Sequence, residues 1–344
     1  MKRPTITDLA KESGVSVSTV NRILAGSTQV KATTAQQVQA AAERIGFYGL
    51  GTIETQIKKN APTYRLGFLM QQSTRELYQL FAQMIRTVCH ERPLDVVEPV
   101  VDFVDLLTPE NIAQRLKVLG EHCDAVAIIA ADHPLIGQTI RDLKEAGKPV
   151  VTYITDQSAP ERAAFVGTDN WKLGRTAAWL ITNMVPPEGR IAIFQGNHRY
   201  QCQDTADASF RSFVRENAPN LTVENSRPTH EISDNAYQMV RELLDTTDDV
   251  VGIFIVGGGI SGVLRALRQA PVERRKNIKL ICRDIGPETR KGLSEGLITA
   301  ALCHPMRQTT EALVQTMIDS VNSQTPQSTI QCTVPFEIIT PANI

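Results

Sequence analysis

Residues 5–48 read TITDLAKESGVSVSTVNRILAGSTQVKATTAQQVQAAAERIGFY, and this stretch decides how the first part of the chain folds. Apolar residues recur in it at helical spacing in three successive groups, which predicts three short helices. The groups are Ile6, Leu9 and Ala10, then Val15, Val20, Ile23 and Leu24, and finally Val38, Ala41, Ala42 and Ile45. The sequence therefore predicts a small all-α head.

Polar residues stand where the ends of these helices need hydrogen-bond partners. The candidate caps are Thr5 with Asp8, Ser16, and Thr33 with Gln36. Gly14 supplies a tight turn between the first and second helices. Two helices joined by such a turn form the helix-turn-helix arrangement, in which the second helix reads DNA.

The second helix keeps an outer face of short or polar side chains, which consists of Val17, Ser18, Asn21 and Arg22. Such a face can enter a major groove and reach base edges. Charge supports a DNA-binding head, because the chain up to Asn60 holds eight Lys and Arg against four Asp and Glu, a net of +4. The whole chain sums to −1, so the remainder carries −5. A basic head on an acidic body is typical of proteins that bind phosphates through the head.

The segment TITDLAKESGVSVSTVNRILAG closely resembles the head of the lactose-repressor (LacI) family of bacterial transcription regulators, and the resemblance extends over the whole chain. It implies a repressor that binds a palindromic operator as a homodimer under the control of a small molecule. We expect Val17, Ser18 and Arg22 to meet base edges, with Arg22 suited to guanine. The residues expected at phosphates are Thr5, Ser16, Thr19, Asn21 and Thr34.

Residues 50–63 follow the predicted head, 1–49, and read as a linker. In the resembled family this segment folds into a hinge helix on DNA, and an apolar side chain, here Ile57, wedges into the minor groove. The chain departs from the family at Leu50 and Gly51, where Pro and Asn are usual, and at Glu54, where Ala is usual. Phosphate repels the carboxylate of Glu54, and Gly51 makes a helix more costly to form. The sequence therefore leaves open whether Ile57 enters the minor groove.

From Tyr64 onward, apolar runs such as YRLGFLM and VGIFIV alternate with amphipathic helical stretches. This alternation predicts parallel sheets covered by helices on both faces, and two series of it predict an α/β body of two Rossmann-like lobes. The body looks like the type I periplasmic-binding-protein fold. We expect an effector-binding and dimerisation domain over 64–344, with lobe 1 at about 64–165 and 303–327 and lobe 2 at about 166–302 and 328–344.

Two facing lobes of this kind create a ligand cleft beyond the carboxyl ends of their strands. The predicted effector-binding residues at those ends are Gln71, Ser73, Asp156, Asp204, Asp207, Gly258, Asp284 and His304. By resemblance, Asp284 matches a family carboxylate that accepts from ligand hydroxyls. His304 falls where the family often has Gln at the crossing between lobes.

The family's ligand-clamping Arg corresponds to Ala206 in this chain, with Asp204 and Asp207 on either side. A pocket lined by acids favours hydroxyl or amine donors, so the sequence predicts a neutral sugar or polyol as effector. His198 and Arg199 are the residues that could restore a cation.

Parts of the sequence also fit two other classes of protein, an NAD-dependent oxidoreductase and an exported solute-binding protein. Residues 257–262, GGGISG, satisfy the GxGxxG pattern between a strand and a helix with Asp284 downstream, which is the local context of an NAD-dependent oxidoreductase. The motif lies late in the chain, and no GxSxG, HExxH or P-loop is found, so we expect no enzyme and no cofactor. The body alone would also suit an exported solute-binding protein, but the basic head argues against that.

The rest of the composition narrows the class further. Six scattered cysteines without a CxxC pair predict buried free thiols rather than a metal site or disulfides. No apolar stretch of about eighteen residues and no signal-peptide pattern is found, so we expect a cytoplasmic protein of the bacterial nucleoid with no membrane partner. The C-terminal FEIITPANI is predicted to contain a final strand.

Overall fold

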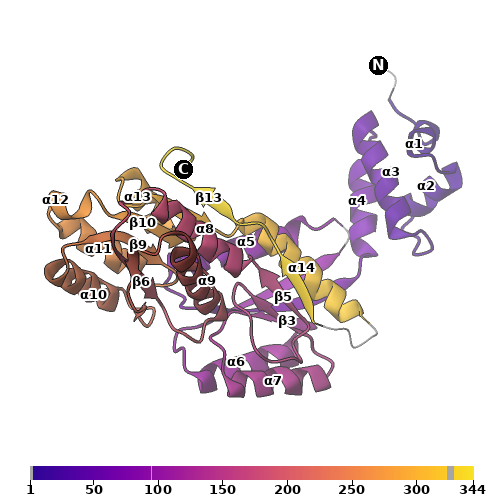
Figure 1. Cartoon of the computed structure of the whole chain (residues 1–344). Coiled ribbons are helices and arrows are strands. Elements are labelled where there is room, and N and C mark those ends of the chain that lie inside the picture. Colours follow the sequence, from indigo (N-terminus) through magenta and orange to yellow (C-terminus); the bar gives the residue numbers. More distant parts are fainter. Residues whose placement is uncertain (1–2, 94, 324–328) are drawn as a thin grey trace. The chain divides into compact units, whose positions relative to one another are not determined.

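The computed structural model describes residues 3–93, 95–323 and 329–344 (Figure 1). The chain divides into two compact units, one of residues 1–65 with 86–99 and the other of 66–85 with 100–344. The predicted lobe boundary between residues 327 and 328 lies outside the described residues.

The head contains four helices: α1 (Ile6–Ser13), α2 (Val17–Leu24), α3 (Ala32–Ile45) and α4 (Leu50–Lys59). The first three are the predicted ones. Thr5 caps α1 through a capping box with Asp8, and Ser16 caps α2. The predicted capping box at Thr33 is wrong, because the backbone is already helical at Ala32 and leaves Thr33 inside the first turn of α3. The residue before α3, Lys31, makes no side-chain cap.

One hydrophobic core holds the four helices together. Leu9 of α1, Val20 of α2, Val38 of α3 and Ile53 of α4 have no exposed surface, and Phe47 between α3 and α4 is 3% exposed. Removing such a side chain down to Ala costs about 2–5 kcal/mol, because a cavity replaces the lost contacts. The fourth helix is therefore part of the folded head.

The body contains two sheets. The strands of the first are β1 (Thr63–Gln71), β2 (Val96–Val104), β3 (Ala125–Ile128), β4 (Val150–Tyr153), β5 (Ala164–Gly167) and β12 (Ile330–Thr333), in the order β12-β5-β4-β3-β1-β2. The strands of the second are β6 (Gly189–Gln195), β7 (Leu221–Val223), β8 (Arg227–Pro228), β9 (Val250–Ile255), β10 (Lys279–Arg283), β11 (Ala300–Cys303) and β13 (Glu337–Ile339). Their order is β13-β11-β10-β9-β6-β7, with β8 also paired to β6.

Helices connect these strands and cover the sheets, as the alternating pattern predicts (Figure 1). In chain order, the helices that come directly before or after strands of the first sheet include α5 (Glu76–Glu91), α6 (Pro109–His122), α7 (Pro134–Glu145) and α14 (Met306–Asn322). The others are α8 (Asn170–Thr182), α9 (Gln201–Asn217), α10 (Ser233–Thr246), α11 (Ile260–Gln269), α12 (Val272–Arg275) and α13 (Pro287–Ser294). Among the described residues, no helix has the length and apolar character needed to span a membrane.

The two-lobed α/β body is confirmed, but one strand lies in the other lobe from the one predicted. The sequence assigned residues 328–344 to lobe 2, yet β12 belongs to the first sheet, where it pairs in parallel with β5, a strand that spans the predicted boundary between residues 165 and 166. Only β13, the predicted final strand, joins the second sheet, antiparallel to β11. An apolar run shows that a strand is buried, but it does not show which sheet supplies its hydrogen-bond partners.

Candidate DNA-binding head and ligand cleft

The outer face of α2 carries the residues predicted to read DNA. Its inner face is buried through Val20 and Ile23. The exposed face consists of Val17, Ser18, Asn21 and Arg22. Ser16 fixes the start of the helix, because its hydroxyl accepts from the Thr19 backbone N–H at 3.1 Å. The helix thus presents a short-chained polar surface with one guanidinium, which suits a major groove.

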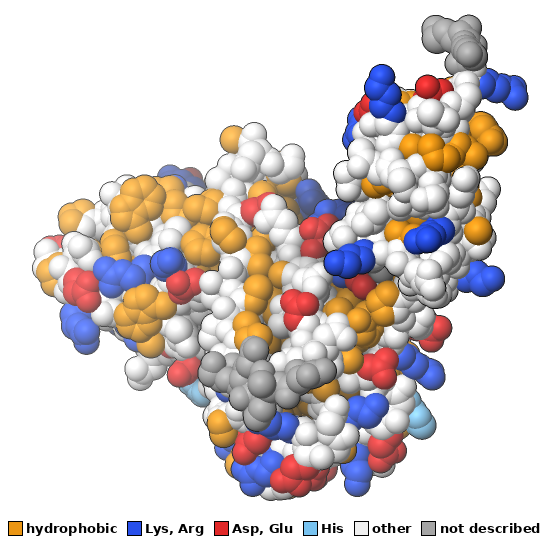
Figure 2. All heavy atoms as spheres, turned by 90° about the vertical axis from the view of Figure 1, so that its right-hand side faces the viewer, with side chains coloured by type: hydrophobic (Ala, Val, Ile, Leu, Met, Phe, Trp, Pro, Cys, Tyr) orange, Lys and Arg blue, Asp and Glu red, His pale blue; other side chains and the backbone are white. Residues whose placement is uncertain are grey.

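The residues predicted to contact phosphates lie in the first three helices or at their starts. The Thr5 hydroxyl donates to Oδ2 of Asp8 at 2.7 Å, and Thr5 is exposed at the start of α1. Thr19 and Thr34 are half-buried. The face of the head seen in Figure 2 carries Lys and Arg side chains spread over its surface, in keeping with its net positive charge.

The segment predicted as a linker is the helix α4, and it packs on the head. Ile53 is fully buried, and Ile57, the candidate wedge, is half-buried against the same core. The side-chain amide of Asn60 donates to the carbonyl of Gly26 at 3.1 Å. Gly26 follows the recognition helix with a φ of +72°, and the Gln56 side chain lies where a Cβ would stand. The C-terminal half of α4 is therefore fastened to the turn after α2.

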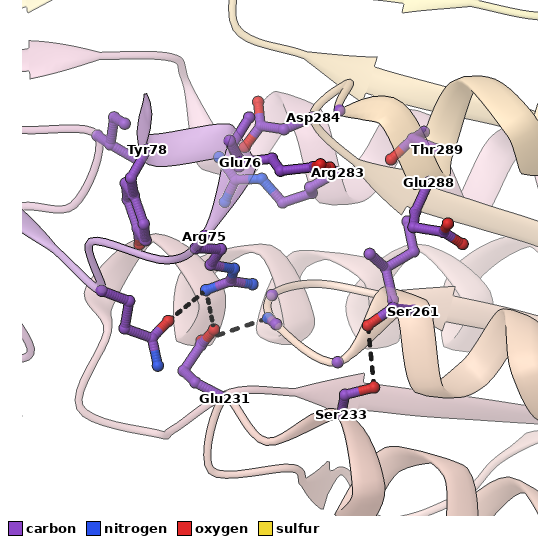
Figure 3. Close-up of a pocket in the computed structure, with 18 of the residues that line it drawn as sticks. Arg75, Glu76, Tyr78, Glu231, Ser233, Ser261, Arg283, Asp284, Glu288 and Thr289 are labelled. Atoms are coloured by element: carbon purple, nitrogen blue, oxygen red, sulfur yellow. Dashed lines mark hydrogen bonds and ion pairs between the residues drawn. The ribbon is translucent and has the colours of Figure 1, made fainter. Parts of the chain in front are cut away.

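In the body, a cavity of about 590 Å³ opens at the carboxyl ends of strands from both sheets. Its walls come from the segments that follow β1, β4, β9 and β10, as expected for facing parallel sheets. The polar and charged residues that line it include Arg75, Glu76, Glu231, Ser233, Ser261, Arg283, Asp284, Glu288 and Thr289 (Figure 3). Of the predicted effector residues, Gly258 and Asp284 line this cavity.

An ion pair crosses the cavity from one lobe to the other. Nη1 of Arg75, which follows β1, lies 2.7 Å from Oε2 of Glu231, which follows β8 (Figure 3). The other carboxylate oxygen of Glu231 accepts from Nε2 of Gln203 at 3.1 Å and from the N–H of Gly258 at 3.3 Å. Burial alone would lower the pKa of Arg75, but the charge of Glu231 raises it, so the guanidinium stays protonated.

Asp284 is held by His304 at the end of β10. Its Oδ1 lies 2.6 Å from Nδ1 of the imidazole and accepts from the backbone N–H of His304 at 3.0 Å. Burial alone would raise the pKa of Asp284, but His304 and then Arg283 hold it well below its ordinary value. The carboxylate is therefore ionised and available as an acceptor. His304 itself is buried behind it and does not line the cavity.

Gln71 and Ser73 lie close behind the first lobe's wall. Oε1 of Gln71 accepts from the hydroxyls of Tyr78 at 3.2 Å and Tyr200 at 3.0 Å, and burial raises the pKa of both phenols, which keeps them as donors. Ser73 is bound through its N–H and hydroxyl to Asp105. Both predicted residues have protein partners and stand outside the cavity lining.

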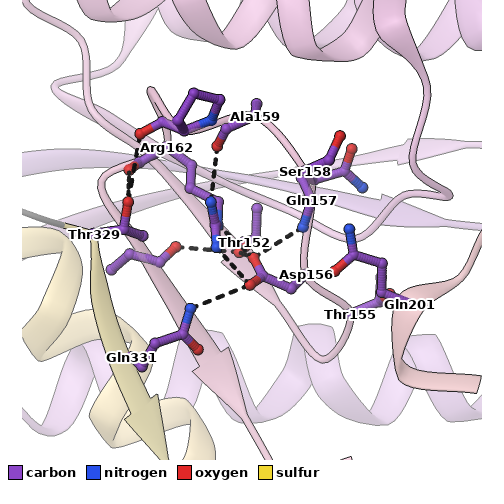
Figure 4. A network of polar contacts seen from close by, with 12 residues as sticks. Thr152, Thr155, Asp156, Gln157, Ser158, Ala159, Arg162, Gln201, Thr329 and Gln331 are labelled. Atoms are coloured by element: carbon purple, nitrogen blue, oxygen red, sulfur yellow. Dashed lines mark hydrogen bonds and ion pairs between the residues drawn. The ribbon is translucent and has the colours of Figure 1, made fainter. Parts of the chain in front are cut away.

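Asp156 is the centre of a polar network at the edge of the first sheet (Figure 4). Its carboxylate receives Nε of Arg162 at 2.6 Å and the hydroxyl of Thr152 at 2.7 Å, and Gln331 of β12 donates to it at 3.3 Å. Burial alone would raise the pKa of Asp156, but the hydrogen bonds from Arg162 and Thr152 lower it. The network ties β12 to the loop after β4, and Asp156 does not face the cavity.

The acids on α9 also lie away from the cavity lining. Asp207 is 9% exposed and accepts from Nε of Arg211 at 2.8 Å and from the hydroxyl of Ser226 at 2.5 Å. Asp204 is exposed. Neither Asp204 nor Asp207 therefore lines the cavity as predicted, because a helix that begins near the cleft turns successive residues to different sides.

The two residues proposed to restore a cation occupy the same loop. Nδ1 of His198 is hydrogen-bonded to Nε2 of Gln195. The carbonyl of Arg199 accepts from the N–H of Asp132 at 2.7 Å, and Arg199 lines a second hollow beside α7. The cations at the cavity come from Arg75 and Arg283, which the sequence reading missed.

Within the segment GGGISG, Gly258 lies against the protein's own carboxylate, that of Glu231. Glu231 lies so close to Gly196 and Gly258 that a Cβ at either position would stand less than 2 Å from a carboxylate oxygen. Gly259 has a φ of +99° and precedes α11. Side chains of the protein thus lie against this backbone, Gln203 at Gly257 and Glu231 at Gly258.

Some functional residues carried a weak sequence signal. Arg283 directly precedes Asp284 at a strand end, and Arg75 follows the strand end at Gln71. Both therefore lie at the carboxyl ends of strands, as the predicted effector-binding residues do. Glu231 had no such signal, because it lies in a loop beyond the two-residue strand β8. All six cysteines are free, and no cluster of metal-binding side chains occurs among the described residues.

Comparison with known proteins gives two family matches. The model for bacterial regulatory proteins of the lacI family matches residues 5–49, and the periplasmic binding protein domain matches residues 66–325, most of the body. The chain belongs to the LacI family. The HTH-type transcriptional regulator GntR of Escherichia coli K12 is 27% identical to this LacI-family chain over 180 residues, which is 51% of this chain and 50% of that protein.

Solved structures resemble the body of the LacI-family chain. A solute-binding protein from Burkholderia graminis in complex with D-arabinose has a TM-score of 0.74 at 18% identity, covering 82% of this chain and 97% of that one. A solute-binding protein from Agrobacterium vitis bound to α-D-tagatopyranose has a TM-score of 0.73 at 16% identity, covering 81% and 95%. At these identities the likeness establishes the fold.

Proposed function

We propose that this chain is a transcription repressor that binds a palindromic operator as a homodimer and changes its affinity for DNA when a sugar or polyol binds in the cleft. The exposed polar face of α2 in a lacI-type head carries the DNA-binding part of the proposal. A single head offers few base contacts, and two heads on a two-fold axis double them. Acting on DNA places the protein in the cytoplasm, at the nucleoid.

The residue roles follow from the predicted contacts. Val17, Ser18 and Arg22 read bases, while Thr5, Ser16, Thr19, Asn21 and Thr34 hold phosphates. Ile57 enters the minor groove when the head is on DNA. In the cleft, Gly258 and Asp284 bind the effector together with Arg75 and Arg283.

The effector class is supported by the chemistry of the cleft. Ser233, Ser261 and Thr289 line the cavity together with Asp284, and polyols need a partner for each buried hydroxyl. The solute-binding proteins with this fold include complexes with arabinose and tagatose. We infer that the cleft binds its ligand without transforming it.

The same neighbours favour one other function, that of a solute-binding protein. The two functions differ in what the head does, because a transport protein has no use for a DNA-reading helix. Binding sites are first selected from random DNA with the full chain, and affinity is then measured with and without a panel of sugars and polyols. Sequence-selective binding that one ligand shifts supports the regulator. Ligand binding without any selected DNA sequence would falsify it.

A matched pair of variants assigns the ligand response to the cleft. Asp284→Ala is expected to abolish the effect of the ligand while DNA affinity in its absence stays unchanged. Asp245→Ala, an exposed acid on α10, is expected to respond as the unaltered chain does. A full response from the Asp284 variant removes this residue from the proposed site.

A further inference from the structure

A buried guanidinium at the cavity has a donor with no acceptor. Arg283 is 9% exposed and lines the cavity. Its Nε is buried and has no hydrogen-bond partner in the described part of the chain. Arginine is always protonated and can only donate, so the guanidinium of Arg283, which lines the cavity, has capacity for an acceptor that the described part of the chain does not supply.

The charge of Arg283 is not matched by a partner of its own. Among residues 3–93, 95–323 and 329–344, no carboxylate lies within 4.0 Å of its guanidinium nitrogens, although Arg75 has Glu231. Nη2 of Arg283 lies 3.4 Å from Nε2 of His304, whose Nδ1 holds Asp284. The imidazole of His304 thus stands between the guanidinium and the carboxylate of Asp284, and a buried charge without a counter-ion in contact is costly.

The remaining acids at the cavity do not fill this role. Glu288 is paired with Arg268 at 3.1 Å, and Glu76 is exposed at the start of α5. In Figure 3, Arg283 and Asp284 lie on one side of the cavity, and Glu231 and Ser233 on the other. A ligand in this space meets a guanidinium at one side and hydroxyl and carboxylate acceptors around it.

We infer that the effector is a polyhydroxy carboxylic acid, such as an aldonate or a uronate, whose carboxylate binds Arg283. This refines the neutral sugar or polyol expected from the sequence and rests on the proposed function. A carboxylate matches the planar fork of arginine through charge-assisted hydrogen bonds and supplies the missing acceptor and the missing charge together. The ligand's hydroxyls donate to the free side of Asp284 and pair with the serines of the opposite wall.

The test uses matched pairs of probes that differ only in the acid group. The full chain is titrated calorimetrically with galacturonate and galactose, glucuronate and glucose, and galactonate and galactitol. One acid is expected to bind roughly tenfold or more tightly than its neutral partner, in line with the strength of charge-assisted bonds. Arg283→Gln is expected to remove that preference, and Arg283→Lys to keep part of it.

The control variant is Arg290→Gln, which removes an exposed arginine of α13 outside the cavity lining and should leave the preference intact. Thermal melting checks that each variant is folded. A neutral sugar that binds more tightly than its acid overturns the inference and leaves the proposed function standing. Failure of every acid and every neutral probe to bind or to shift DNA affinity overturns both.

Discussion

Arg75 and Glu231 join the two lobes through an ion pair of 2.7 Å across the ligand cavity. Glu231 has a side chain that is 6% exposed, and its backbone, like that of His230, has a positive φ. A non-glycine residue in that region is held there by its surroundings. The lobes of this protein are therefore linked directly by a contact that a ligand entering the cavity must meet.

This contact predicts a measurable coupling between its two residues. Arg75→Gln and Glu231→Gln should each lower the free energy of unfolding, since either leaves a partly buried group without its partner. The double variant should lose less than the sum by about 0.5–3 kcal/mol. Urea unfolding of the four chains measures this cycle, and additive losses would show that the pair does not hold the lobes together.

The lowered pKa of Asp284 makes the stability of the body depend on pH in the acidic range. Folding lowers the pKa of this carboxyl below its ordinary value of 3.8, so its contribution to stability is present above that value and is lost as the pH falls. Asp284→Asn should reduce stability at neutral pH and flatten the decline below about pH 4. Melting temperatures across this range give the comparison, with Asp245→Asn on exposed α10 as the control expected to keep the decline.

We expect Arg22 to contribute to the preference of the head for one DNA sequence over others. Arg22→Ala should cost about 1–3 kcal/mol of binding free energy on the selected operator and relax the preference at one base pair. The same change at exposed Arg215 on α9 should leave both unchanged. Competition titrations with operator DNA and with operators changed at single base pairs measure both effects in the Arg22 variant and in the unaltered chain. An unaltered preference in the Arg22 variant would exclude the assigned reading helix.

Variants of Ile53 and Ile57 distinguish packing within the head from insertion of a side chain into the minor groove. Ile53→Ala should destabilise the head by about 2–5 kcal/mol, because its side chain is fully buried. Ile57→Ala should cost less stability, since the side chain is half-buried, and should weaken operator binding if the side chain enters the minor groove. Melting and operator titration of both variants distinguish these effects. Unchanged DNA affinity with a folded Ile57 variant would remove the wedge.

Local sequence patterns predicted the elements well. The period of Leu9, Val20 and Val38 specified three helices, and the caps at Thr5 and Ser16 depend on contacts three residues apart, which a sequence displays directly. The alternation of strands and helices predicted both lobes and the edge of the sheets where the cavity lies. These are properties of short segments, and they need no knowledge of distant partners.

The details of the cavity depended on partners that local patterns do not reveal. Asp156 follows the end of β4 as predicted and Asp207 lies on the helix after β6, but Arg162 and Arg211 bind them, and a one-dimensional pattern does not show which acid keeps a free face. Glu231 reaches the cavity from a loop without any period. The place of β12 beside β5 likewise depends on pairing between segments more than 160 residues apart, as the register of Ile330 with Ala164 shows.

The bond from Asn60 to Gly26 has a thermodynamic consequence for the switch. A tether that is ordered only on DNA must lose the backbone freedom of each residue at the moment of binding, about 1–2 kcal/mol per residue. In this head Leu50, Ile53 and Ile57 of α4 already pack in the core that the recognition helix shares, so much of that ordering is complete before the head meets DNA. We expect operator affinity to depend less on thermal unfolding of this helix than it would for a segment that folds only on DNA.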